Sequence, residues 1–225
     1  MLNYQKICII GSGLTALTIA YLLSKFKLQI DIVEQDRSKK KIKPTKLALS
    51  KHSLDQLFFY GLKDIKKKSS VVKNIYLYDS YSSISLKQDL HFSASNKKDA
   101  LAYIIDGNTL SSDINKKLKS LKNINFVNKE ISSIRDNKFF KEIIFKDLNK
   151  DNYKLIIFAS ANNLFLLSKF KLRKVIDKPY SEDAYVFNLH HKKIINNSAR
   201  QFFFKRWTFS ISAGFKNRDF RNLVY

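Results

Sequence analysis

The stretch Lys6-Ile7-Cys8-Ile9-Ile10-Gly11-Ser12-Gly13-Leu14-Thr15-Ala16 decides the fold of this 225-residue chain. Its first five residues are an apolar run that predicts a β-strand, and the glycine turn follows at once. An apolar helix is predicted from there to about Phe26, and a second strand over 29–33 ends in Glu34. Strand, glycine turn, helix, strand and acid in this order are typical of a dinucleotide-binding βαβ unit.

Each residue type in this unit has a physical role. Gly11 allows the tight turn after the first strand, and Gly13 lets the backbone approach a pyrophosphate. The helix N-terminus offers unpaired N–H groups and the positive end of its dipole to the phosphates. Ala16 replaces the third glycine of the pattern, where helix and strand pack closely. We predict that the cofactor-binding residues are Gly11, Ser12, Gly13, Leu14, Thr15, Ala16 and Glu34.

Glu34 indicates which dinucleotide is bound. It lies 21 residues beyond Gly13, about where an acid accepts hydrogen bonds from a ribose. A carboxylate there repels a 2′-phosphate, so FAD or NAD is favoured over NADP. The alternative is an α/β domain whose glycine turn binds nothing.

The chain is strongly basic. It has 42 Lys and Arg residues against 19 Asp and Glu, for a net charge of +23. The functional interpretation is a nucleic-acid or anionic-membrane partner. The other interpretation is compositional bias, because the excess is mostly lysine beside abundant Asn and Ile, which share A/T-rich codons. The densest runs, 39–41 and 66–68, are expected as solvated loops or helix ends.

Hydropathy and cysteine content indicate a globular cytoplasmic protein. Hydrophobic residues make up 44% of the chain, and no apolar run approaches the roughly 20 residues needed to span a bilayer. The N-terminus leads directly into a core strand, so no secretory signal is expected. Cys8 is the single cysteine, and its place in the first strand predicts buried packing.

The rest of the chain mixes short apolar segments with further helices. Helices are predicted over 53–60 with Gly61 as the stop, from Ser111 or Ser112 to about Leu121, and over 163–170. Strands are predicted over 71–79, 83–86, 124–127, 130–135, 139–145, 185–190 and 201–204, with 101–105 as a strand or the approach to a helix. The continuous apolar run 153–159 predicts a buried parallel strand.

Conventional catalytic patterns are missing from the sequence. There is no cysteine cluster, HExxH motif, P-loop or nucleophile elbow. His190 and His191 are adjacent on a predicted strand and point to opposite faces, so they do not easily share a metal. The other two histidines are His52 and His91. We therefore name no catalytic and no metal-binding residue.

Four stretches carry a family resemblance. They are 9–16 through Glu34, Leu47-Ala48-Leu49-Ser50 with a helix ending in Gly61-Leu62, 101–106 with the helix after it, and Leu155-Ile156-Ile157-Phe158-Ala159. In this order they resemble the FAD-dependent aromatic hydroxylases of ubiquinone biosynthesis (Ubi/Coq type), which share the para-hydroxybenzoate hydroxylase fold. Together they span about residues 5–172.

The resemblance implies an α/β fold with a Rossmann-like FAD-binding domain over 1–172. Residues 71–97 would be inserted into an interleaved substrate-domain sheet, which would begin again at 173–225. The implied cofactor is FAD, the implied reductant is NAD(P)H, and the implied reaction hydroxylates a prenylated phenolic ubiquinone precursor. Contact with the inner face of the membrane and with other ubiquinone-biosynthesis proteins is implied as well, whereas nucleic acid is not. Such enzymes place a flavin in a dry pocket and need no acid–base triad.

The chain departs from the family at several positions. Ser160-Ala161 replace an Asp-Gly motif, and Thr45 stands where an arginine is expected, with Lys46 beside it. A later Gly-Asp motif has no counterpart, so we expect a truncated, N-terminal half without a complete active site. Segment 206–215 has no clear periodicity, and a back-translation shifted by one base resembles the next segment of the family. We therefore hypothesise an out-of-frame tail from Arg206.

Two other functions remain open. A non-catalytic nucleotide-binding or scaffold protein would retain the βαβ unit and Glu34 but would not catalyse a reaction. A basic protein that binds a polyanion or a membrane surface would use the charge of +23 and would bind with steep salt dependence.

Overall fold

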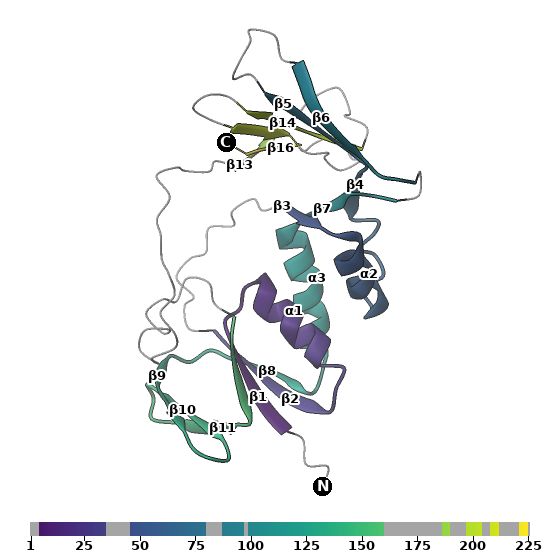
Figure 1. Cartoon of the computed structure of the whole chain (residues 1–225). Helices are drawn as coiled ribbons and strands as arrows, with labels where there is room; N and C mark the ends of the chain where they lie inside the picture. Colours follow the sequence, from purple (N-terminus) through teal and green to yellow (C-terminus); the bar gives the residue numbers. More distant parts are fainter. Residues whose placement is uncertain are drawn as a thin grey trace. The chain divides into compact units, whose positions relative to one another are not determined.

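The fold is described from a computed structural model of the chain. The structure describes residues 5–34, 46–79, 87–96, 99–159, 186–189, 197–203, 208–211 and 221–224. The chain forms two compact units, shown in Figure 1. Unit 1 combines residues 1–41 with 111–178, and unit 2 combines 42–110 with 179–225. Each unit is therefore built from two separate stretches of sequence.

Unit 1 contains a parallel four-stranded sheet in the order β12-β1-β2-β8. Its strands are β1 (Gln5–Ile10), β2 (Leu28–Val33), β8 (Ile124–Val127) and β12 (Leu155–Phe158), and α1 (Leu14–Leu23) connects β1 to β2. Ile9, Ile30 and Ile32 are fully buried. Apart from the buried Asp31, the inner residues of the central strands are apolar, as expected where both faces of a sheet are covered.

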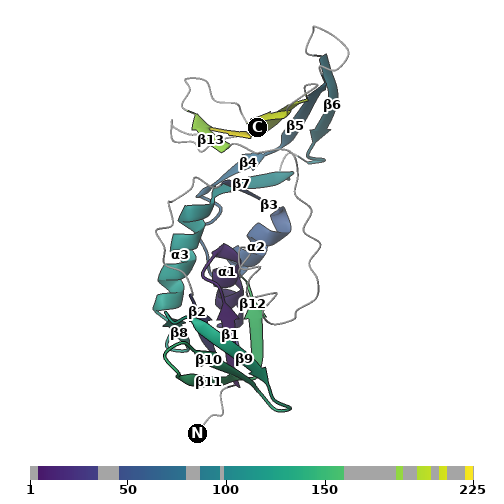
Figure 2. The same cartoon turned by 90° about the vertical axis from the view of Figure 1, so that its left-hand side faces the viewer.

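An antiparallel three-stranded sheet covers one of these faces (Figure 2). It consists of β9 (Ile131–Asp136), β10 (Lys141–Phe145) and β11 (Lys150–Tyr153). The two sheets share a hydrophobic core made of Cys8, Ile10, Val33, Ile131, Ile143, Phe145 and Tyr153. The predicted burial of Cys8 is confirmed, because its side chain is fully enclosed in this core.

Unit 2 contains a small antiparallel sheet in the order β3-β7-β4. The elements are β3 (Lys46–Leu49), α2 (Lys51–Phe59), β4 (Ser69–Val72) and β7 (Ala102–Asp106). The hydroxyl of Ser50 caps α2 by accepting the N–H of Ser53 at 3.1 Å. Gly61 follows α2 with φ of 111°, a conformation that favours glycine, and this explains the helix stop.

A six-stranded sheet completes unit 2, in the order β13-β16-β15-β14-β5-β6. Its strands are β5 (Asn74–Asp79), β6 (Lys87–Ser93), β13 (Val186–Leu189), β14 (Ser198–Phe203), β15 (Thr208–Ile211) and β16 (Arg221–Val224). β14 pairs in parallel with β5, whereas the other neighbours are antiparallel. The early hairpin and the late strands thus share one sheet.

The predicted α/β class with a Rossmann-like parallel sheet is confirmed. Some local predictions need correction. The predicted strand 71–79 is two strands, β4 and β5, separated at Lys73, and β11 was not predicted. The parallel strand expected over 153–159 is β12, but it is an edge strand and Leu155 is half exposed. The predicted segments 83–86 and 163–170 lie outside the described residues.

The start of the third helix also differs from its prediction. α3 (Gly107–Lys119) begins four residues before Ser111. The carboxylate of Asp106 caps it by accepting the N–H of Thr109 at 2.9 Å and the hydroxyl of Thr109 at 3.1 Å. Asp106, at the end of β7, therefore caps α3 in place of the predicted Ser111 or Ser112.

Candidate dinucleotide site

The glycine turn joins the carboxyl end of β1 to α1. Gly11 has φ of 126°, which only glycine adopts without strain, and its N–H donates to the carbonyl of Val33 at 2.9 Å. Gly13 is different, because its φ of −72° is open to any residue. A Cβ added at Gly13 would meet no atom of the chain within 4 Å. The backbone conformation thus requires glycine at position 11, whereas neither the backbone nor the neighbouring atoms require it at position 13.

The N-terminus of α1 opens next to this turn. Gly13 is the N-cap, and the first helical bond runs from the N–H of Leu17 to the carbonyl of Gly13 at 3.0 Å. No side chain caps α1, and its first turn holds no acidic residue. The N–H groups of Leu14, Thr15 and Ala16 therefore remain available to an anion. The side chain of Ala16 is fully buried, as expected where helix and strand pack closely.

Glu34 is held against the glycine turn. The hydroxyl of Ser12 donates to Oε1 of Glu34 at 2.6 Å, and the N–H of Glu34 donates to the carbonyl of Val127 at 3.0 Å. The acid and the glycine turn, which are far apart in the sequence, thus form one site at the carboxyl ends of β1 and β2. Both Ser12 and Glu34 are predicted from the sequence to bind the cofactor, but their contact with each other is not predictable from the sequence alone.

These features fit the adenosine diphosphate part of a dinucleotide. The open space over Gly13 is where a phosphate could approach the backbone, and the helix N-terminus supplies N–H donors. Glu34 supplies a carboxylate for ribose hydroxyls. The residues of this site therefore have the polar groups that the adenosine diphosphate part of a dinucleotide needs.

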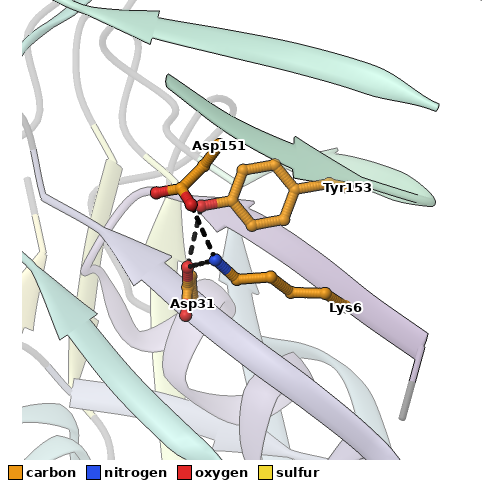
Figure 3. Close-up of polar contacts among 4 residues, drawn as sticks. All are labelled: Lys6, Asp31, Asp151 and Tyr153. Carbon is orange, nitrogen blue, oxygen red and sulfur yellow. Dashed lines mark hydrogen bonds and ion pairs between the residues drawn. The ribbon is translucent and has the colours of Figure 1, made fainter. Parts of the chain in front are cut away.

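A polar cluster lies between the two sheets of unit 1, with Asp31 and Tyr153 buried and Lys6 and Asp151 partly exposed, and Figure 3 shows its four side chains. The carboxylate of Asp31 is 1% exposed and accepts the hydroxyl of Tyr153 at 2.7 Å. Nζ of Lys6 lies 3.0 Å from Oδ2 of Asp31 and 3.0 Å from Oδ1 of Asp151. The second oxygen of Asp31 has no hydrogen-bond partner within the described residues. The cluster links β1 and β2 to β11.

Burial and charge change the protonation of this cluster. Burial alone would lower the pKa of Lys6, but its hydrogen bonds to Asp31 and Asp151 outweigh this and raise it. Burial and then the hydrogen bond to Asp31 raise the pKa of Tyr153. Burial, followed by the charge of Asp31, raises the pKa of the Cys8 thiol, which stays protonated and unreactive. The cluster therefore connects β1, β2 and β11 as a structural link and does not act as an acid–base pair.

Lys46 lies in unit 2, beside the position where the family resemblance expects an arginine. Its Nζ lies 3.1 Å from Oδ2 of Asp106, the residue that caps α3. Burial alone would raise the pKa of Asp106, but the Thr109 N–H and Lys46 outweigh it and lower that pKa. Thr45 and Ser160-Ala161, the other positions of departure, lie outside the described residues.

The described residues hold no metal site. No group of three or more His, Cys, Asp and Glu side chains within them could bind an ion. His52 is exposed on α2, and His91 is exposed on β6, where its ring stacks on that of Tyr76 at 4.4 Å. His190 and His191 lie outside the described residues. None of the helices that the structure describes is long and apolar enough to cross a membrane.

Comparison with known proteins identifies the fold. No protein-family model matches the chain, and no curated protein does. Among solved structures, PqsL from Pseudomonas aeruginosa, a probable FAD-dependent monooxygenase, has a TM-score of 0.81 at 16% identity. The match covers 99% of this chain and 60% of PqsL.

Two further solved structures agree with this. The p-nitrophenol 4-monooxygenase PnpA from Pseudomonas putida has a TM-score of 0.77 at 15% identity, covering 98% of this chain and 57% of PnpA. HpxO from Klebsiella pneumoniae, complexed with FAD and uric acid, has a TM-score of 0.72 at 13% identity, covering 100% and 57%. The chain thus spans about 60% of the length of these proteins, and over that span it has the fold of FAD-dependent monooxygenases.

Proposed function

We propose that the glycine turn, the N-terminus of α1 and Glu34 bind the adenosine diphosphate part of FAD. One observation carries this: the 2.6 Å hydrogen bond from Ser12 to Glu34 fixes the ribose-binding acid beside an uncapped helix N-terminus. The carboxylate of Glu34 disfavours a 2′-phosphate, so FAD and NAD fit this site better than NADP. The fold of the solved FAD-dependent monooxygenases favours FAD.

We propose further that the chain is part of an FAD-dependent monooxygenase, reduced by NAD(P)H, which hydroxylates a prenylated phenolic ubiquinone precursor. The support for this substrate is the series of four sequence stretches, from 9–16 to 155–159. When bound, FAD would supply the redox and oxygen chemistry. The residues of this chain would orient the adenosine end and the phosphates. The remaining 40% of the solved proteins has no counterpart here, so the flavin ring would need a second half of the fold.

A titration of the full chain with FAD, followed by flavin fluorescence, tests the binding step. Gly13→Val fills the open space over the turn, and Glu34→Arg reverses the charge that faces the ribose, so each should weaken binding at least 100-fold. Glu34→Gln keeps the size of the side chain and should cost about tenfold, the loss expected for one charge-assisted hydrogen bond.

Controls separate binding from folding. Thr18→Ser, one turn further along α1, keeps every backbone N–H and should bind FAD as the unchanged chain does. Each variant should retain its circular dichroism spectrum. Equal FAD affinity in the unchanged chain, Gly13→Val and Glu34→Arg would show that FAD does not bind at this turn.

The loss of the Asp-Gly motif at Ser160-Ala161 favours one other function, a non-catalytic nucleotide-binding or scaffold protein. NADH oxidation by the FAD-loaded chain separates the two proposals. The scaffold proposal predicts FAD binding with the same dependence on Gly13 and Glu34 but no oxidation of NADH above the rate of free FAD.

A further inference from the structure

Three large apolar side chains are exposed at one end of unit 1. Phe26, between α1 and β2, is 60% exposed, Phe139 in the β9–β10 turn is 78% exposed, and Leu155 at the start of β12 is 51% exposed. Exposed apolar side chains that gather on one surface mark an interaction site more often than scattered ones do.

Strand register and hydrogen bonds place these three residues at the same end. Leu28, two residues after Phe26, is the register partner of Gln5 at the start of β1. The N–H of Lys154 donates to the carbonyl of Lys6 at 2.8 Å, and its Nζ donates to the carbonyl of Phe139 at 3.2 Å. This is the amino end of the parallel sheet, opposite the glycine turn. Its four strands span only about 15 Å, three spacings of about 4.8 Å.

The segments at this end of the sheet are rich in lysine. The α3–β8 connection joins this end as well, because Nδ2 of Asn123 donates to the carbonyl of Leu28 at 3.0 Å. The segments 24–28, 119–123, 136–141 and 154–155 contain one acid, Asp136, which pairs with Lys141. They contain seven lysines, so their net charge is +6: Lys25, Lys27, Lys119, Lys122, Lys138, Lys141 and Lys154. We call these lysines with Phe26, Phe139 and Leu155 the amino-end surface.

Only Lys141 of these seven forms an ion pair within the described residues. Elsewhere in unit 1, Lys129 lies 2.8 Å from Asp147 and Lys146 pairs with Glu130, whereas Lys116, Lys117 and Lys150 form no ion pair within the described residues. Six of the seven lysines of the amino-end surface thus have no acidic partner within the described residues, and they lie in the same segments as three exposed apolar side chains.

We propose that the amino-end surface docks on an anionic lipid bilayer. The two phenyl rings and Leu155 would enter the headgroup region, and the lysines would lie over anionic phosphates. Binding to a nucleic-acid backbone would use the lysines but gain nothing from the three apolar side chains. This inference is independent of FAD binding, which belongs to the opposite end of the sheet.

Co-sedimentation of the full chain with lipid vesicles tests the proposal. Vesicles with about 30% phosphatidylglycerol in phosphatidylcholine should bind the chain, and pure phosphatidylcholine should bind it far less. The double variant Phe26→Ala/Phe139→Ala should bind at least tenfold more weakly. The triple variant Lys25→Gln/Lys27→Gln/Lys138→Gln should lose about 100-fold, at about fivefold for each lysine.

Matched controls lie in unit 2. Phe59→Ala removes a phenyl ring that is 75% exposed, and Lys63→Gln/Lys67→Gln/Lys68→Gln removes three lysines; both should bind vesicles as the unchanged chain does. Equal losses in the control and test variants would overturn the proposal, as would the absence of binding to anionic vesicles. Binding to an RNA duplex that competes with vesicles and ignores Phe26→Ala/Phe139→Ala would assign the surface to nucleic acid instead.

Discussion

The two ends of the parallel sheet in unit 1 differ in chemistry although the same four strands form both. At the carboxyl end, Gly11 turns the chain in a conformation reserved for glycine, and Ser12 holds Glu34. At the amino end, the connections carry lysines and exposed phenyl rings. A parallel sheet separates two sets of loops by the length of its strands, so one end can bind a small anion while the other meets a large surface. The polar cluster around Asp31 lies between the two ends.

The largest expected effect comes from breaking that cluster. Asp31→Ala would remove the partner of Lys6 and Tyr153 from a site that is 1% exposed, so we expect a loss of about 3 kcal/mol in the free energy of unfolding. Asp31→Asn keeps an acceptor for the tyrosine hydroxyl and should lose about half as much. Urea unfolding followed by circular dichroism measures both.

Asp151→Asn is the control for this prediction. Asp151 shares the same lysine but is 40% exposed, and we expect a change of less than about 1 kcal/mol. If Asp151→Asn and Asp31→Ala lowered the free energy of unfolding equally, the burial of Asp31 would not determine how much the polar cluster stabilises the fold.

The two glycines of the turn should separate stability from binding. Gly11→Ala forces a side chain into a backbone with φ of 126° and should cost about 2 kcal/mol in the free energy of unfolding. Gly13→Ala has an allowed φ of −72° and open space for its Cβ, so its free energy of unfolding should change by less than about 0.5 kcal/mol. FAD affinity should fall in Gly13→Ala all the same. Equal destabilisation by the two substitutions in urea unfolding would remove the distinction.

Much of the carboxyl end could be predicted from the sequence because its signals are local. The apolar run, Gly11, Gly13 and the acid at the end of the second strand occur at fixed spacings, and each spacing has one physical reason. The predicted strand and helix of this unit agree with β1, α1 and β2 to within a few residues.

The rest could not be predicted because it depends on contacts between distant segments. In the sequence Asp31 is only a polar residue within a predicted strand. The packing of β11 against the parallel sheet gives it Tyr153 as a partner, 122 residues away. The amino-end surface was equally hidden, since its lysines come from four separate segments. Total charge alone could not tell this surface from a uniform excess of lysine.

Alkaline pH should lower the free energy of unfolding through three groups in or next to the polar cluster, Lys6, Cys8 and Tyr153. The pKa values of Lys6, Cys8 and Tyr153 are all raised in the folded chain. Above about pH 9 the unfolded chain therefore holds fewer protons than the folded chain, and the stability that is present below this pH is lost as pH rises. The slope is about 1.4 kcal/mol per pH unit for each proton. Urea midpoints between pH 8 and 11 should fall, and less steeply in Tyr153→Phe above pH 10.

The smallest effect concerns the two hairpin turns of the covering sheet. Leu148, in the β10–β11 turn, is 81% exposed and has φ of 65°, which is unfavourable for a leucine. Leu148→Gly should relieve this strain and raise the free energy of unfolding by up to about 1 kcal/mol. Phe139, in the β9–β10 turn, is 78% exposed without a positive φ, so Phe139→Gly should bring no gain. Vesicle binding should be unchanged in Leu148→Gly and reduced in Phe139→Gly. This result would show that the β10–β11 turn differs from the β9–β10 turn: backbone strain matters at Leu148, whereas membrane contact matters at Phe139.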